Sequence, residues 1–131
     1  MATRPRITKY PVILNGNMSG NISGTPSIIQ DLTLIGYALS WSGTAPVGTA
    51  SIQVSNDYAL DGDGRTVSNA GTWTTITLNY NGSAVTSIPI TGNTGTAYID
   101  IDSHSAYAMQ LIYNATSGTG TLQAIVNAKV A

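Results

Sequence analysis

The chain has no cysteine and no glutamate, and its single histidine is His104. Without cysteine it can form neither a disulfide framework nor a thiolate metal site. Without glutamate it lacks half of the usual supply of residues for paired-carboxylate chemistry. His104 and Asp102 can hydrogen-bond on one strand face, but no Gly-x-Ser-x-Gly nucleophile motif accompanies them. We therefore expect no enzymatic activity, no catalytic residues and no cofactor.

Charged residues are also scarce, at 8% of the 131 residues, against about a quarter in an average soluble domain. Serine, threonine, asparagine and glycine fill the polar positions instead. A surface with so little charge repels its neighbours weakly, whereas proteins that stay monomeric generally carry more. The composition therefore favours a component of an assembly, with a small polar β-domain as the alternative.

Long apolar runs are absent as well. No segment is long enough for a transmembrane helix, and none follows the basic N-terminal residues as a secretory signal would require. We expect a protein that is made and assembled in a cytoplasm and has no membrane partner.

The few charges are unevenly placed. Arg4, Arg6 and Lys9 precede Tyr10, whereas all the acidic residues lie from Asp31 onward. Residues 1–9 therefore form a short basic arm that can bind an acidic partner, although a disordered tail is the alternative. Three basic residues without interleaved aromatics are too few to predict nucleic-acid binding. We predict that the arm acts as an electrostatic tether to a protein partner.

Period-two alternation dominates the rest of the chain. The clearest case is residues 106–129, which predict a closing hairpin with a Ser-Gly-Thr-Gly turn. One face of its two arms is apolar, comprising Tyr107, Met109, Leu111 and Tyr113, then Leu122, Ala124, Val126 and Ala128. The opposite face carries uncharged side chains that suit a contact with a neighbouring subunit, including Gln110, Thr121, Gln123 and Asn127.

Residues 32–42 and 49–56 predict a second hairpin by the same pattern, and residues 73–80, 85–90 and 96–102 predict further strands. Asn81-Gly82 is a hairpin turn signal. No segment has a sustained helical period. The prediction is thus an all-β, antiparallel two-sheet sandwich, jelly-roll-like, formed as a single domain by residues 10–131.

The long polar segment 57–72 is the one loop with concentrated charge, and function is expected there. Asp57, Asp61 and Asp63 with nearby glycines can wrap a calcium ion, but the match to a calcium-binding loop is poor. We favour Asx-turns that satisfy loop backbone groups, and we predict no metal site.

Four segments resemble small virion proteins of tailed bacteriophages: SWSGTAPVGTASIQVSND, WTTITL, TAYIDID and YAMQLIYNATSGTGTLQAIVNAKV. The resemblance spans most of the chain from Leu32 onward. It implies a jelly-roll capsid accessory protein, either a cement (decoration) subunit on the outer face of a phage head or a head-fibre base. It also implies a virion location after assembly in the host bacterial cytoplasm, the major capsid protein as partner, and no catalytic residues.

Aromatic residues support a second hypothesis, a carbohydrate-binding or receptor-binding module of a phage fibre or tail, because flat rings can stack on a glycan. The candidate rings are Trp41, Tyr58, Trp73, Tyr80 and Tyr98, of which Tyr98 is predicted to point outward from the strand 96–102. Trp41 shares a face with apolar residues and is expected in the core, so Trp73 is the better candidate for an exposed ring. The predicted partner-binding residues are thus Arg4, Arg6, Lys9, Tyr58 and Trp73, and self-association as a dimer or trimer is expected.

Overall fold

The computed structural model describes residues 7–30, 32, 34–101 and 106–129, which form antiparallel strands and contain no helix. The strands, in chain order, are β1 (Ile7–Asn17), β2 (Ile22–Ser23), β3 (Ser27–Ile28), β4 (Leu34–Ser55), β5 (Ala59–Leu60), β6 (Val67–Asn69), β7 (Thr74–Thr75), β8 (Leu78–Tyr80), β9 (Ser83–Val85), β10 (Ile88–Thr91), β11 (Thr94–Ile101) and β12 (Ala108–Lys129). The predicted all-β class is confirmed.

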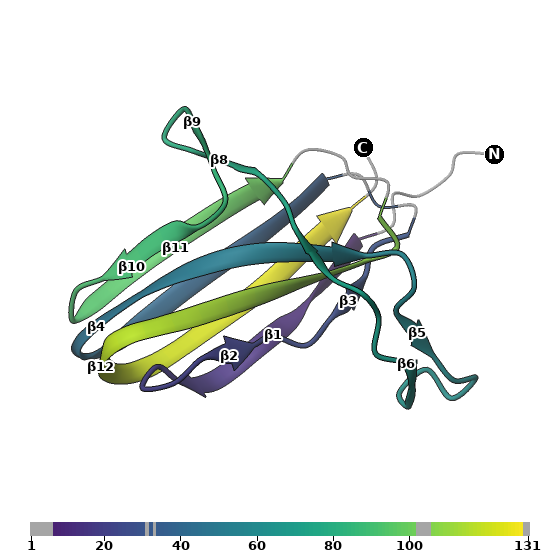
Figure 1. Cartoon of the computed structure of the whole chain (residues 1–131), viewed down its shortest axis with the longest axis horizontal. Coiled ribbons are helices and arrows are strands. Elements are labelled where there is room, and N and C mark those ends of the chain that lie inside the picture. Colours follow the sequence, from purple (N-terminus) through teal and green to yellow (C-terminus); the bar gives the residue numbers. More distant parts are fainter. Residues whose placement is uncertain (1–6, 31, 33, 102–105, 130–131) are drawn as a thin grey trace.

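Two long strands organise the molecule. β4 and β12 pair antiparallel along their whole length, and together they bend over at one end of the molecule (Figure 1). Before the bend, residues 34–42 of β4 pair with residues 121–129 of β12; after it, residues 47–55 pair with residues 108–117. The paired strands β4 and β12 therefore form part of both sheets of the sandwich.

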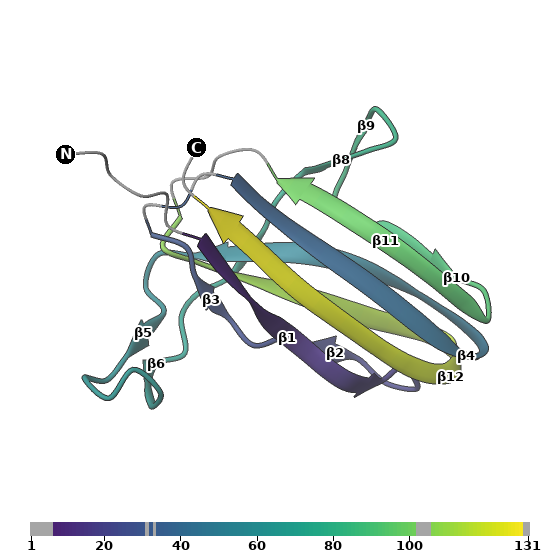
Figure 2. The same ribbon diagram turned by 180° about the vertical axis from the view of Figure 1, so that it is seen from behind.

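Shorter strands complete each layer. Sheet 1, seen in front in Figure 2, has the order β1, β12 (121–129), β4 (34–42), β11. Sheet 2, in front in Figure 1, places β2 and β3 beside β12 (108–115), then β4 (47–55), then β7 and β10. Four strand positions in each of two layers make a jelly-roll-like sandwich, as predicted.

The two predicted hairpins are wrong in their pairing. The arms of residues 106–129 do not hydrogen-bond to each other, because each pairs with β4 in a different sheet. The same holds for the arms 32–42 and 49–56, which are the two halves of β4. Alternation specifies which side chains face inward, and this part of the prediction is confirmed, but it does not specify which strand lies alongside.

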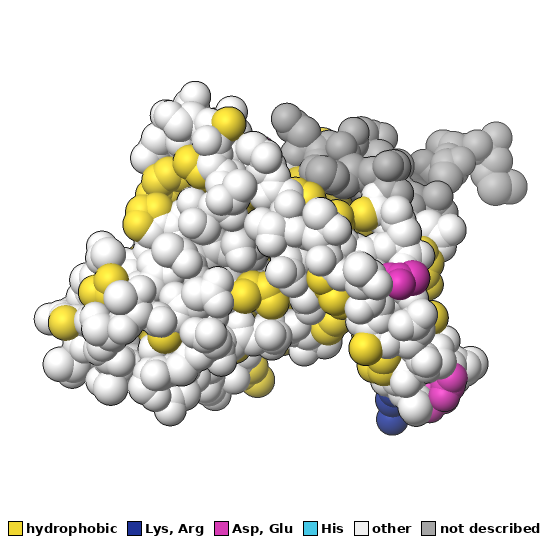
Figure 3. Space-filling model, viewed as in Figure 1, with side chains coloured by type: hydrophobic (Ala, Val, Ile, Leu, Met, Phe, Trp, Pro, Cys, Tyr) yellow, Lys and Arg dark blue, Asp and Glu magenta, His cyan; other side chains and the backbone are white. Residues whose placement is uncertain are grey.

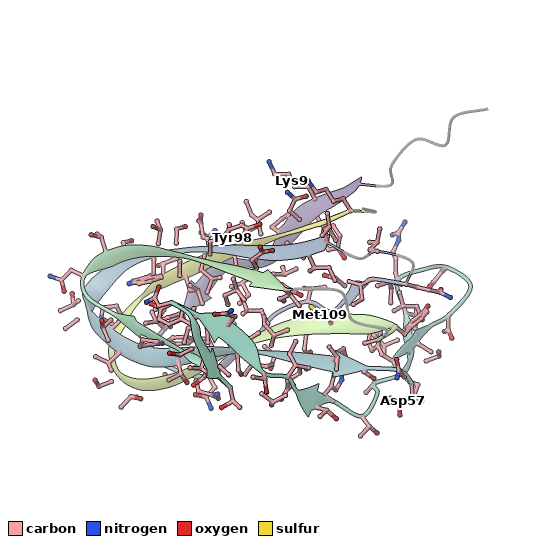
Figure 4. The ribbon with its side chains drawn as sticks, turned by 90° about the horizontal axis from the view of Figure 1, so that it is seen from above. Lys9, Asp57, Tyr98 and Met109 are labelled. Atoms are coloured by element: carbon pink, nitrogen blue, oxygen red, sulfur yellow. The ribbon has the colours of Figure 1, made fainter. Side chains whose placement is uncertain are left out.

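The core fills the space between the sheets. Met109 lies between the layers in Figure 4, and Leu111 and Tyr113 beside it on sheet 2 are also fully buried. From sheet 1, the inward residues of β12 are buried too: Leu122, Ala124, Val126 and Ala128. Burial raises the pKa of the Tyr37 phenol, which comes from β4 on sheet 1.

Glycine allows the bend of β4 (residues 43–48) and the bend of β12 (residues 116–120) to pack against each other. Gly118 has a φ of 81°, and a Cβ at this position would collide with the Ala45 carbonyl. Ala45 itself has a positive φ, and its amide donates to the Asn93 side chain at 2.8 Å. The bends are therefore held by a neighbouring turn as well as by each other.

The Asn81-Gly82 turn prediction is confirmed. Asn81 and Gly82 have φ angles of 51° and 83° and join β8 to β9, as a two-residue type I′ hairpin requires. Pro89 lies in β10 at the edge of sheet 2, where a missing donor is tolerated.

Candidate interaction surfaces

The charged loop at residues 57–73 uses its polar groups internally. The Asp57 carboxylate accepts hydrogen bonds from the Thr72 amide at 2.7 Å and from the Ser55 hydroxyl at 2.8 Å. These bonds, that of the Thr72 amide foremost, hold the pKa of Asp57 below its usual value. Asp57 thus closes the loop onto the end of β4.

Asp63 organises the tip of the same loop. Its carboxylate accepts hydrogen bonds from the Thr66 hydroxyl at 2.6 Å and from the Arg65 and Thr66 amides at 2.8 and 2.9 Å. The Thr66 hydroxyl, followed by these amides, lowers the pKa of Asp63 to about 2. This is the predicted Asx-turn, and no group of three acidic or histidine side chains suited to a metal occurs among the described residues.

Tyr58 and Trp73 pack against each other beneath the loop. Their ring centroids are 5.6 Å apart at an interplanar angle of 53°, and the Trp73 indole donates to the Ala70 carbonyl at 2.8 Å. Tyr58 is only 8% exposed and Trp73 is half-buried. The pair forms a small apolar centre for the loop, so the Tyr58 ring is not open to a ligand or partner.

The three basic residues of the predicted arm have different outcomes. β1 begins at Ile7, so Lys9 lies within this strand opposite Asn127, and its side chain is exposed. Arg4 and Arg6 lie outside the described residues, as do Asp102 and His104.

Several polar side chains on the outer face of sheet 2 form hydrogen bonds within the chain. Gln110 donates to the Gln53 side chain at 2.8 Å, and Gln53 donates to the Thr75 hydroxyl at 3.5 Å. Ser55 on this face is buried, and its hydroxyl oxygen accepts from the Tyr58 amide at 3.1 Å. Gln110 was predicted on one outer face with Thr121, Gln123 and Asn127; those three lie on sheet 1 instead, because the ribbon bends between them.

The outer face of sheet 1 is open. Most of the exposed large apolar side chains of the described residues lie along it: Leu14 at 70%, Tyr98 at 60%, Leu34 at 43% and Ile125 at 40% exposure. A hollow of about 660 Å³ lies over Ala38 and Ser40, with Tyr98 on β11 and Leu14 on β1 among its lining residues. The Tyr98 hydroxyl lies against Gly36, so a Cβ at residue 36 would collide with it. In the edge-on view of Figure 4, Tyr98 and Lys9 lie at this layer, away from the charged loop that contains Asp57.

This apolar face was missed by the sequence reasoning, although the sequence carries a signal for it. Tyr98 was predicted to point outward, and Ile125 falls at an outward position between Gln123 and Asn127. A large apolar residue at an outward position of an alternating strand is the signal, because exposed apolar patches often mark interaction sites.

The charged side chains of the described residues gather at one end of the sandwich. Lys9, Asp100 and Lys129 lie near the beginning of β1 and the end of β12, and the loop beyond β4 carries Asp57, Asp61, Asp63 and Arg65. In Figure 3 the charged atoms are accordingly confined to one end, and the rest of the visible face is uncharged. The bends and turns at the opposite end (residues 18–21, 43–48, 92–93 and 116–120) contain no charged residue.

No protein-family model matches the chain, and no curated protein sequence matches it. Among solved structures, the SPBc2 prophage-derived protein YomS is similar over 97% of both chains, with a TM-score of 0.60 and 14% identity. Two structures from infectious bursal disease virus are also similar at 12% identity: that of the Gx strain has a TM-score of 0.53, and that of the VP2 subviral particle has a TM-score of 0.50. This chain spans about a third of those two viral chains (32% and 33%). The likenesses show that the chain has a jelly-roll-like β-sandwich fold.

Proposed function

We propose that this chain is a viral structural protein, a decoration or cement subunit that binds the outer surface of a phage head and stabilises it. The observation that carries the proposal is the uncharged surface of the sandwich away from its charged end. The similarity to a prophage protein along nearly its whole length, and to structures of a virus and of a viral subviral particle, supports a virion role.

The physical argument concerns the cost of binding a shell. Uncharged side chains enter an interface without the large desolvation penalty that an unpaired charge carries. The bends at the uncharged end are fixed by the packing of Gly118 and by hydrogen bonds that Asn93 accepts from the Gly43 and Ala45 amides, so little conformational freedom remains to be lost on binding. A subunit of this kind binds the major capsid protein by shape and needs no catalytic group.

The basic residues Arg4, Arg6 and Lys9 supply the second part of the proposal. They act as an electrostatic tether whose contribution weakens as salt screens it. Lys9 lies on β1 at the charged end of the sheet, so the tether is at the end opposite the bends.

The proposal is tested on the phage that encodes the protein. Immunogold labelling of purified virions should place the protein on the head, and heads from a phage lacking its gene should lose their DNA at a lower temperature than wild-type heads. Label on the tail tip or fibres would support the alternative receptor-binding or glycan-binding module. Absence of the protein from the virion would overturn both.

A further inference from the structure

We propose that two copies of this chain pack the outer faces of sheet 1 against each other about a two-fold axis that runs along the strands, between β4 and β12. The inference concerns the isolated protein and does not depend on the capsid role. It rests on how charge and side-chain size are distributed across the four strands of this face.

The outward residues form rows across sheet 1. At the charged end, after Leu34 on β4 and the exposed Lys129 on β12, the first complete row contains Asp100 on β11, Gly36 on β4, Asn127 on β12 and Lys9 on β1. The next row contains Tyr98, Ala38, Ile125 and Pro11 in the same strand order. Beyond it lie Thr96, Ser40 and Gln123, then Thr94, Ser42 and Thr121.

The charges of the first row are complementary under this symmetry. Within one copy, Asp100 and Lys9 are three strand spacings apart, or about 14 Å. Neither has a side-chain hydrogen bond or ion pair among the described residues, and both are exposed. A two-fold axis along the strands exchanges the edges of the sheet, so β11 of one copy faces β1 of the other. Lys9 then meets Asp100 of the second copy, twice in each dimer.

Side-chain sizes are complementary in the same way. The axis places β4 of one copy opposite β12 of the other, and beyond Leu34 at the charged end the outward residues of β4 are small: Gly36, Ala38, Ser40 and Ser42. The larger outward residues of β12 occupy the same rows: Asn127, Ile125, Gln123 and Thr121. Ile125 of the second copy thus enters the hollow over Ala38, and Tyr98 meets Pro11 of the second copy.

The perpendicular two-fold axis lacks this match. If the axis ran across the strands, the rows would be reversed end to end, and Asp100 would face the uncharged Thr94 of the second copy. Each copy would then bury charges without a partner, which is costly.

The size of the face predicts a reversible dimer. Four strands span about 19 Å, and positions 34–42 of β4 span about 26 Å, giving roughly 500 Å² per copy. About 1,000 Å² in total is the lower limit for a specific interface. Association should therefore depend on concentration.

The first test measures mass by sedimentation velocity and light scattering from about 1 μM to about 500 μM, where such a small interface dissociates. The wild type should shift from monomer to dimer. Ala38→Arg places an unpaired charge at the centre of the interface and should raise the dissociation constant about a hundredfold. Ala84→Arg is the matched control, because Ala84 is exposed on β9 away from this face, and it should dimerise like the wild type. Circular dichroism confirms that each variant is folded.

The second test addresses the axis itself and stands even if Ala38→Arg does not fold. Lys9→Asp and Asp100→Lys should each weaken the dimer about tenfold, by placing like charges opposite each other. The double variant restores an opposite-charge pair and should recover wild-type association.

Three results would overturn the proposal: a monomer at every concentration, a trimer, or a double variant no stronger than the single ones. Because these measurements use the purified protein alone, their failure is distinct from failure of the capsid proposal, which is read from virions.

Discussion

The two outer faces of the sandwich are built from the same two long strands but differ in what their side chains do. On sheet 2, Gln110, Gln53 and Thr75 hydrogen-bond to one another, and Ser55 is buried under the charged loop. On sheet 1, Ser40 and Gln123 lie beside Tyr98 and Ile125 around an open hollow. Gln123 also donates to the Asn15 side chain at 2.9 Å, so the two faces differ mainly in the large apolar side chains that sheet 1 exposes.

The difference shows that charge does not mark the more open surface of this chain. The loop at residues 57–73 holds much of the charge, yet Asp57 and Asp63 accept hydrogen bonds from within it. The open face has charge only at its end. It exposes large apolar side chains beside small residues, a feature that often marks an interaction site.

The largest effect on stability should come from the apolar centre beneath the loop. Trp73→Ala removes the ring that packs on Tyr58 and should lower the free energy of unfolding by about 2 kcal/mol. Tyr98→Ala, on the open face, should cost the monomer about 0.5 kcal/mol or less, because its ring is mostly exposed. Urea unfolding at low protein concentration measures both, and equal costs would contradict the comparison.

A smaller effect should follow from the serines of the two faces. Ser55→Ala leaves the Tyr58 amide and the Asp57 carboxylate without their shared partner and should cost about 1.5 kcal/mol. Ser40→Ala is the matched change on sheet 1, where the hydroxyl is exposed, and should change stability by less than about 0.5 kcal/mol. Thermal unfolding measures the stability of both variants. A loss of stability in Ser40→Ala equal to that in Ser55→Ala would contradict the comparison of the two faces.

A change with pH is expected in the loop, at the turn that Asp63 organises. Because the folded pKa of Asp63 is about 2, below the usual value of about 3.9, its hydrogen bonds stabilise the loop above the usual pKa and are lost as pH falls through the folded one. The Arg65 and Thr66 amide resonances should therefore titrate with a midpoint near pH 2. Asp63→Asn should abolish this titration and leave the sheet 1 amides unchanged; a midpoint near 3.9 would show that the turn does not bind the carboxylate.

The smallest effect should come from the basic tether. Since β1 begins at Ile7, the appropriate deletion removes residues 1–6 and leaves the strand intact. Attachment to heads should weaken by less than about tenfold, and more at low salt than at high salt. Co-sedimentation with heads at two salt concentrations measures the change, and equal attachment with and without residues 1–6 would remove the tether from the proposal.

The sequence predicts which side chains face the core better than it predicts which strands pair. The inward residues of β12, from Met109 to Ala128, follow directly from alternation, and the type I′ turn follows from Asn81-Gly82. The pairing partner does not, because a Gly-rich turn between two alternating segments has the same pattern whether it closes a hairpin or carries the chain between sheets. In the structure, Gly118 packs against Ala45, which marks the turn as a bend between sheets. These two residues are far apart in the sequence, so the local pattern does not reveal their contact.

The candidate surfaces were predicted unevenly for a similar reason. Residue type identified Tyr58 and Trp73 as aromatic candidates, but not that they pack on each other beneath a loop. Tyr98 was placed outward correctly, yet its significance depends on neighbours from β4 and β12 that only the register brings together.

The continuity of β4 and β12 through both sheets also has a mechanical consequence. In a sandwich joined only by loops, a shearing force can slide one layer over the other by deforming those loops. Here two hydrogen-bonded strands cross between the layers side by side, so sliding would have to stretch covalent backbone and break ladder bonds at the same bend. A load applied to one sheet is passed to the other through peptide bonds, a property that suits the proposed attachment to a phage head.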